Sequence, residues 1–259
     1  MRVMSFNIRG TFQKDGDNVW PNRRALNIAT IQKCAPDIIG FQEAQSGNLE
    51  AYAQSLPEYA YNLGPISVHK AADYESVPIF WQRDQFVLSR SGSFYLSETP
   101  EVWSIGWEAK LARAVNWVTL WDWQADQEIT VLNTHFPYPL NIEETRDNCA
   151  KLIIERLVPL AENMPIIVMA DFNAVPGTPA YNSFLKAGYA DTYTAAGHTE
   201  EINTYHGFNG DEHDQHGFRI DWILTKGALQ TKSCTVVKDA APPLYPSDHY
   251  PILAELERV

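Results

Sequence analysis

The segment Ile166-Ile167-Val168-Met169-Ala170-Asp171-Phe172-Asn173 decides how this chain is predicted to fold. Its first five residues are apolar and mostly β-branched, which is typical of a strand buried on both faces of a sheet. A carboxylate and a carboxamide, Asp171 and Asn173, follow the run before a loop rich in proline and glycine. Open α/β sheets usually bind ligands at this end of a strand, although an Asx residue that starts an ordinary turn gives the same local pattern.

The composition suits a globular protein with a sizeable core. Hydrophobic residues make up 45% of the 259 residues, and we predict a single domain over residues 1–259 because no linker or low-complexity segment interrupts the chain. Lys and Arg number 20 against 32 Asp and Glu, which gives a net charge of −12. This balance argues against a broad basic surface for long nucleic acid, but it is compatible with a local basic patch.

The N-terminus, the apolar stretches and the cysteines limit where the protein is expected to reside. Residues 1–6 lack the apolar run and cleavage site of a secretory signal, and no stretch approaches the roughly 18–20 apolar residues of a membrane span. Cys34, Cys149 and Cys234 match neither a disulfide framework nor a zinc spacing. A cytoplasmic location is the default expectation, and a chain whose signal peptide had been removed would look the same. No segment implies a protein partner.

Alternating strands and helices are predicted along the chain. We expect strands at 2–8, 37–43, 77–82, 86–94, 114–122, 128–134, 166–170, 218–225, 229–237 and 252–256, with 77–82 and 86–94 forming a hairpin. We expect helices at 22–33, 46–56 and 179–187, and a further helix that begins at an Asn141 cap with Glu144 in capping-box register. Strands with interposed helices occur in each half, which predicts two packed sheets with helices outside.

Polar side chains follow several predicted strands at the point where each strand ends. They are Asn7, Glu43, His135 and the pair Asp171 and Asn173. Each alone could start a turn or lie on the surface. Together, directly after apolar runs, they are expected to converge on one rim of the sheets.

Asp221 and the segment Ser247-Asp248-His249 suggest a second functional pair. Asp221 interrupts an apolar run, and a buried carboxylate must be ion-paired, hydrogen-bonded or metal-bound. An Asp–His hydrogen bond would raise the basicity of His249, as a general-base dyad requires, and would place a pH limb near the usual histidine pKa of ~6.5, shifted by the carboxylate. A polar turn before the last strand is the alternative.

Six motifs in this chain resemble those of the endonuclease/exonuclease/phosphatase (DNase I-like) superfamily, in the same order. They are Ser5-Phe6-Asn7-Ile8-Arg9, Gly40-Phe41-Gln42-Glu43, Asn133-Thr134-His135, Ala170-Asp171-Phe172-Asn173, Arg219-Ile220-Asp221-Trp222-Ile223 and Ser247-Asp248-His249-Tyr250-Pro251. Glu75 and the segment 94–100 are similar to bacterial relatives of the deadenylase-nocturnin branch. The resemblance implies a four-layer α/β sandwich and a phosphoesterase that depends on Mg²⁺ or Mn²⁺.

The resemblance also implies a role for each matching residue. Glu43 would be the principal Mg²⁺ ligand, with Asn7 beside it and Asp248 completing the site, and hard Mg²⁺ prefers such oxygen ligands. Asp171 and Asn173 would orient or deprotonate the attacking water, and whether Asp171 or the Asp221–His249 pair takes the proton stays open. His135 would contact the phosphate, and Glu75 would orient His135. Arg113 would bind the phosphate. His206 would line the substrate mouth or pack beneath it.

The acidic charge favours a small or short phosphate ester over duplex DNA. Candidates are a nucleotide, a sugar phosphate, a phosphoinositide-like headgroup or a short single strand. A metal-dependent nuclease of DNA or RNA is one alternative, and a non-catalytic binding module of the same fold is another. The aromatic residues Trp103, Trp107, Tyr138 and Tyr205 of the predicted rim loops could stack on a base or sugar. The histidines of loop 195–217, His198, His206, His213 and His216, fit no standard zinc motif.

Overall fold

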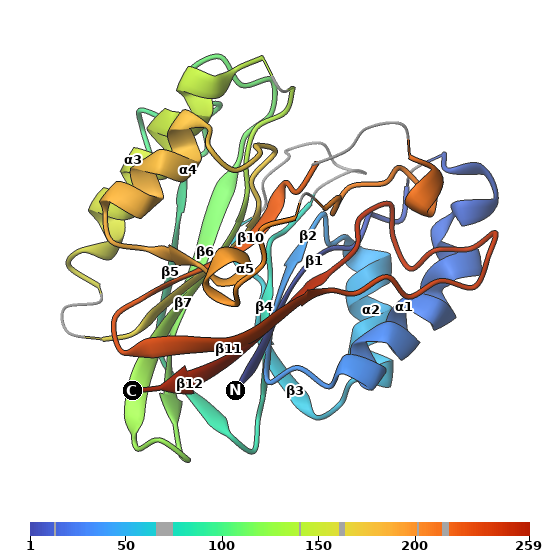
Figure 1. Ribbon diagram of the computed structural model, residues 1–259, viewed down its shortest axis with the longest axis horizontal. Helices are drawn as coiled ribbons and strands as arrows, with labels where there is room; N and C mark the ends of the chain where they lie inside the picture. Colours follow the sequence, from blue (N-terminus) through green and yellow to red (C-terminus); the bar gives the residue numbers. More distant parts are fainter. Residues whose placement is uncertain (13, 66–74, 140, 161–163, 201, 214–217) are drawn as a thin grey trace.

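The computed structural model describes residues 1–12, 14–65, 75–139, 141–160, 164–200, 202–213 and 218–259. Two six-stranded sheets pack face to face, with helices on both outer faces, which confirms the predicted four-layer α/β sandwich (Figure 1). The first sheet has the order β11-β12-β1-β2-β4-β3, and the second has the order β5-β6-β7-β8-β10-β9.

The strands of the first sheet are β1 (Arg2–Asn7), β2 (Ile38–Gln42), β3 (Tyr59–Asn62), β4 (Ile79–Gln82), β11 (Leu229–Val236) and β12 (Ile252–Arg258). Those of the second are β5 (Phe86–Tyr95), β6 (Ala114–Asp122), β7 (Gln127–His135), β8 (Ile166–Asp171), β9 (Ala190–Asp191) and β10 (Asp221–Lys226). Figure 1 shows α1 (Trp20–Cys34) and α2 (Ser46–Ser55) outside the first sheet, and α3 (Glu143–Leu157) and α4 (Pro179–Lys186) outside the second. The short helices are α5 (Thr192–Ala195), η1 (Gly16–Asn18) and η2 (Gly210–Glu212).

Strand direction brings the polar strand ends together. β1 pairs parallel with β2, and β7 pairs parallel with β8, so these four strands end at the same edge of the sandwich. His135 is in register with Asp171 across the β7–β8 pair. β10 runs antiparallel to β8 and begins at this edge, with Asp221 opposite Asp171. The predicted rim therefore forms, and it includes residues from both sheets.

The β8 segment is buried on both faces, as its sequence predicts. Ile167 and Met169 belong to the apolar cluster between the two sheets, whereas Val168 and Ala170 belong to the cluster under α3 and α4. A separate cluster, which includes Phe41 and Tyr52, packs the first sheet against its helices. Alternate side chains of one strand thus join two layers, which fixes the position of Asp171 at its end.

Several sequence expectations need correction. Strands β4 and β5 do not form a hairpin, because the chain crosses from one sheet to the other between residues 82 and 86. Asn141 does not cap α3, whose N-cap position is Ile142. Asp221 does not interrupt β10 but begins it. The short strands β3 and β9 and helix α5 have too few residues to show a periodic pattern. Among the described helices, none combines the length and apolar character that crossing a membrane requires.

Trp222 is expected to contribute strongly to stability because its indole is fully buried and stacks on Phe172, with 4.2 Å between ring centroids. We expect Trp222→Ala to lower the free energy of unfolding by about 3–5 kcal/mol, the usual cost of removing a buried large aromatic side chain. The exposed Trp123, at 61% exposure, is the matched control. Urea denaturation of Trp123→Ala should agree with the parent within about 0.5 kcal/mol, and an equal loss in both variants would contradict the assignment.

Candidate active site

A pocket of about 570 Å³ opens at the edge where the strand ends meet. Its lining combines carboxylates, two arginines, histidines and aromatic rings from loops of both sheets. The lining residues are Arg9, Glu43, Glu75, Leu111, Arg113, His135, Tyr138, Asp171, Asn173, Tyr205, His213, Phe218, Ile220, Asp248 and His249. Most of the residues predicted from strand ends therefore face one shared space.

The backbone around three of these residues is strained. Arg9, Glu43 and Asn173 all have positive φ, at 50°, 59° and 47°. Left-handed backbone is uncommon for residues other than glycine, and such strain concentrates at functional sites. Each residue lies one or two positions beyond the end of its strand, so the turn that ends the strand also directs the side chain into the pocket.

Asn7 connects the acidic residues of the two sheets. Its buried amide Nδ2 donates to Glu43 Oε1 at 3.0 Å and to Asp171 Oδ2 at 2.9 Å. Its Oδ1 accepts from the backbone N–H of Arg9 at 3.0 Å. In this arrangement Asn7 orients both carboxylates, and its amide nitrogen rather than its oxygen faces Glu43.

Glu43 and Asp248 form a pair of like charges that suits a hard cation. Burial, together with the charge of Glu43, raises the pKa of Asp248. Arg9 adds a positive charge here, because its Nη1 lies 3.6 Å from Asp248 Oδ2 while its Nη2 and Nε bind Asp15 at 2.9 and 3.1 Å. Two neighbouring carboxylates oppose each other unless a cation lies between them, and carboxylate oxygens are the ligands that Mg²⁺ prefers. These residues therefore fit the implied metal.

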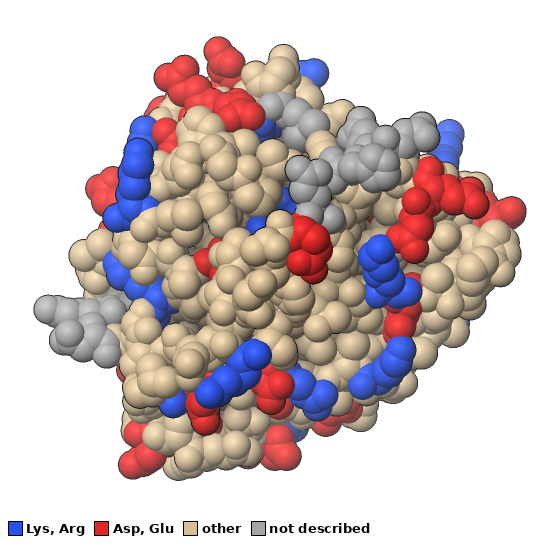
Figure 2. All heavy atoms as spheres, viewed as in Figure 1, with Lys and Arg blue, Asp and Glu red and all other residues tan. Residues whose placement is uncertain are grey.

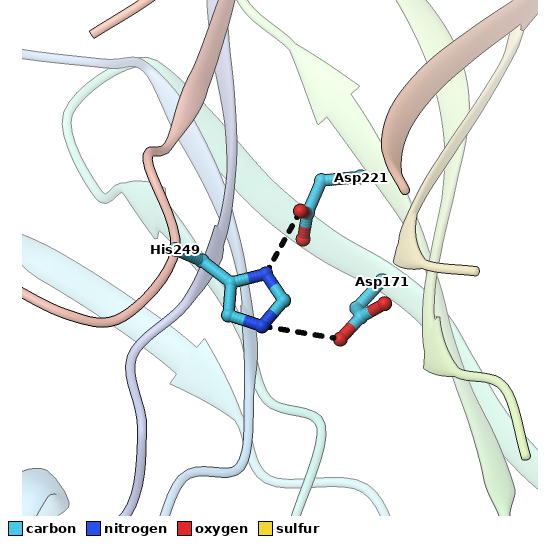
Figure 3. A group of neighbouring side chains, drawn as sticks. All are labelled: Asp171, Asp221 and His249. Carbon is cyan, nitrogen blue, oxygen red and sulfur yellow. Dashed lines mark hydrogen bonds and ion pairs between the residues drawn. The ribbon is translucent and has the colours of Figure 1, made fainter. Parts of the chain in front are cut away.

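Asp171, His249 and Asp221 form a buried chain in which a hydrogen bond joins His249 to Asp221 and His249 lies at ion-pair distance from Asp171 (Figure 3). His249 Nδ1 lies 2.9 Å from Asp221 Oδ2, and Nε2 lies 3.8 Å from Asp171 Oδ2. The three ligand atoms lie within 4.8 Å of one another, so this cluster could also bind a metal. Because both imidazole nitrogens already face carboxylates, the arrangement is better suited to holding a proton than a hard cation.

The charges in this group of three residues give Asp171 and His249 different protonation states at neutral pH. Burial lowers the pKa of His249, but the charges of Asp221 and Asp171 and the hydrogen bond with Asp221 outweigh it and raise the pKa to about 10. His249 is therefore a cation at neutral pH, which differs from the neutral histidine expected from its sequence. Burial and the charge of Asp221 raise the pKa of Asp171 to about 7. A carboxylate with this pKa is suited to accepting a proton near neutrality.

His135, Arg113 and Asn173 form the opposite side of the site. Arg113 Nη1 lies 3.0 Å from His135 Nδ1, and His135 Nε2 lies 3.1 Å from Asn173 Nδ2. Burial, together with the positive charge of Arg113, holds the pKa of His135 well below its usual value, so this imidazole is neutral. Glu75 Oε2 lies 3.6 Å from Arg113 Nη1. Glu75 thus contacts Arg113, which in turn contacts His135.

The structure brings only some of the other expected residues to the pocket. His206 is fully buried and stacks on Tyr250, with 4.0 Å between ring centroids, so it packs beneath the pocket, which is one of the two expected placements. Of the predicted rim aromatics, Tyr138 and Tyr205 are among the described lining residues, whereas Trp103 and Trp107 are not. His216 lies outside the described residues. Arg9 and His213 line the pocket but were not predicted as site residues, although Arg9 is the last residue of the first of the six motifs.

Comparison with known proteins defines the class to which this fold and site belong. The model of the endonuclease/exonuclease/phosphatase family matches residues 4–249. The chain therefore belongs to this family, whose members are hydrolases of phosphate esters and typically depend on divalent metal ions.

Solved structures agree with this membership. The endonuclease/exonuclease/phosphatase from Bacteroides vulgatus is 29% identical, with a TM-score of 0.89 over 100% of this chain and 98% of that one. The mannosyl-6-phosphatase Bt3783 of Bacteroides thetaiotaomicron is 27% identical, with a TM-score of 0.89 and 99% of each chain covered. The human Nocturnin catalytic domain is 20% identical, with a TM-score of 0.78 over 100% of this chain and 93% of that one, and this likeness concerns the fold alone.

Proposed function

We propose that this protein is a divalent-metal-dependent phosphoesterase that hydrolyses a phosphate ester of a small molecule. The observation that carries the proposal is the meeting, in one pocket, of the Glu43–Asp248 pair with the Asp171–His249–Asp221 chain. The Glu43–Asp248 pair would bind Mg²⁺ or Mn²⁺. In the second group, Asp171 would accept a proton and His249 would provide a positive charge. A binding module without catalysis would have no need of both.

Each residue has a defined part in the proposed reaction. Glu43 and Asp248 would hold the metal, which supplies charge neutralisation at the phosphate when bound. Asp171 accepts the proton of the attacking water, and the backbone N–H of Asn173 donates to Asp171 Oδ1 at 2.9 Å, which keeps that carboxylate oriented. His249, held as a cation by Asp221, donates to phosphoryl oxygen. Arg113 lies beside neutral His135 and provides further positive charge near the phosphate.

The surface charge of the protein and the volume of the pocket favour a small substrate. On the face shown in Figure 2, the described basic side chains are scattered among acidic ones and form no continuous basic stripe. The pocket volume of about 570 Å³ lies in the range of small-molecule sites, and Tyr138 and Tyr205 offer rings to a sugar or base. The similarity to a mannosyl-6-phosphatase makes sugar phosphate monoesters the first substrate class to test.

A substrate panel tests this proposal. We expect the purified protein to release phosphate from hexose phosphates or other small phosphate esters with Mg²⁺ or Mn²⁺, and to lose this activity in chelator. Parallel gel assays would use single- and double-stranded DNA and RNA under the same conditions. Strong cleavage of polymers without turnover of small esters would replace the proposal with the nuclease alternative, and no hydrolysis of any ester would favour a binding module.

A further inference from the structure

Arg23 of α1 is a fully buried cation whose guanidinium contacts the segments next to the proposed metal site. Within the described part of the chain, no carboxylate lies at ion-pair distance from its guanidinium, and burial lowers its pKa. Burying a charge in this way is costly unless polar groups compensate for it. The compensation comes from backbone carbonyls. The acceptors are Asn18 at 2.9 Å, Ile8 at 2.8 Å, Pro246 at 2.9 Å, Gly10 at 3.0 Å, and Arg9.

Four of these carbonyls, those of Ile8, Arg9, Gly10 and Pro246, belong to two segments that are distant from each other in sequence and adjacent to the proposed metal site. Residues 8–10 directly follow Asn7, and Pro246 lies two positions before Asp248. The same Nη1 donates to Ile8 and to Pro246, so one atom joins the loop after β1 to the segment that carries Asp248 and His249. A guanidinium is suited to this because it presents five N–H donors in a fixed plane.

Neighbouring contacts reinforce the link. Asn27, one helical turn beyond Arg23, donates to the carbonyl of Pro246 at 3.1 Å and accepts from the Tyr52 hydroxyl at 2.7 Å. The guanidinium carbon lies 5.1 Å from the centre of the Trp20 ring. On the site side, Ser247 Oγ donates to the carbonyl of Asn7 at 2.7 Å. The two segments are therefore joined both behind the site and within it.

We propose that Arg23 is a positioning residue that fixes Asp248 relative to Asn7, and thereby relative to the carboxylate of Glu43 that Asn7 holds. This inference rests on the proposed metal site. Because no carboxylate among the described residues pairs with it, Arg23 serves the backbone geometry rather than an ion pair. Without it, the two segments would move apart, and the oxygen ligands would lose their convergence.

The test compares Arg23→Lys and Arg23→Ala with Arg258→Lys. Arg258 is also largely buried and binds Asp122 at 2.9 Å, but it lies beyond the opposite end of β1. We expect Arg23→Lys to weaken Mn²⁺ binding, measured by electron paramagnetic resonance, about tenfold, as loss of outer-shell support does. We expect kcat on the best small ester to fall about 100-fold with a smaller change in KM, because a displacement of about 1 Å can cost that much. Millimolar guanidinium should partly restore Arg23→Ala.

Hydrogen exchange provides a readout that does not depend on activity. We expect faster exchange in Arg23→Lys for peptides covering residues 8–11 and 245–250, and no change there in Arg258→Lys. A folded Arg23→Lys with parental Mn²⁺ affinity and parental exchange would overturn the inference, and so would a uniform rise in exchange over the whole chain. If the parent protein binds no Mn²⁺, the proposed function fails, and the exchange comparison still decides whether Arg23 links the two segments. If Arg23→Ala does not fold, Arg23→Lys alone decides.

Discussion

Replacing Glu43 by glutamine is expected to reduce metal-dependent hydrolysis of the best small ester by about 10³-fold, because a bound metal contributes several kcal/mol and each 1.36 kcal/mol is a factor of ten. The substitution keeps the shape of the side chain and the acceptor for Asn7 Nδ2, so the loss would come from charge. The measurement is kcat/KM over a Mg²⁺ titration. Weak recovery at high Mg²⁺ is expected if Glu43 acts through the metal.

The matched control is Glu50→Gln, which changes an exposed glutamate of α2 by the same chemistry. It should hydrolyse the ester at the parental rate with the parental Mg²⁺ dependence. If Glu43→Gln kept full metal-dependent activity, the metal would have to lie elsewhere, and the buried cluster of Asp171, Asp221 and His249 would become the next candidate.

The positions that could be predicted from the sequence are those where a buried strand ends. The apolar run before Asp171 fixes a central strand, and parallel pairing then brings Asp171 to the same edge as His135. This inference needs only local pattern and the geometry of parallel sheets. The same reasoning placed Asn7 and Glu43 on the rim, and the structure brings both to within hydrogen-bonding distance of each other.

The features that could not be predicted depend on contacts between distant segments. The turn at residues 83–85 resembles a hairpin because alternation does not tell which sheet a strand joins. Arg23 has the pattern of a residue on the surface of a helix, and its burial depends on carbonyls from distant segments, such as Ile8 and Pro246. His249 was expected to have the pKa of an ordinary paired histidine, but Asp171 approaches its other nitrogen and adds a second negative charge.

Replacing Asp171 by asparagine is expected to lower kcat/KM by about 10²- to 10⁴-fold, the usual contribution of a general base. In the parent protein, kcat/KM should rise with pH as Asp171 loses its proton, with the acidic limb near its raised pKa of about 7. It should fall again as His249 loses its proton near its raised pKa of about 10. In Asp171→Asn the acidic limb should disappear from the residual rate.

Two further variants separate Asp171 from its neighbours. Asp84→Asn removes an exposed carboxylate and should leave the pH profile unchanged. Asp221→Asn removes the charge that, after burial, has the largest effect on the pKa of His249. The alkaline limb of the pH profile should therefore move to lower pH. The acidic limb should also move to lower pH, because the charge of Asp221 raises the pKa of Asp171. An Asp171→Asn protein that retained the parental acidic limb would show that another group accepts the proton. Loss of that limb in Asp221→Asn alone would instead assign the base to the Asp221–His249 pair.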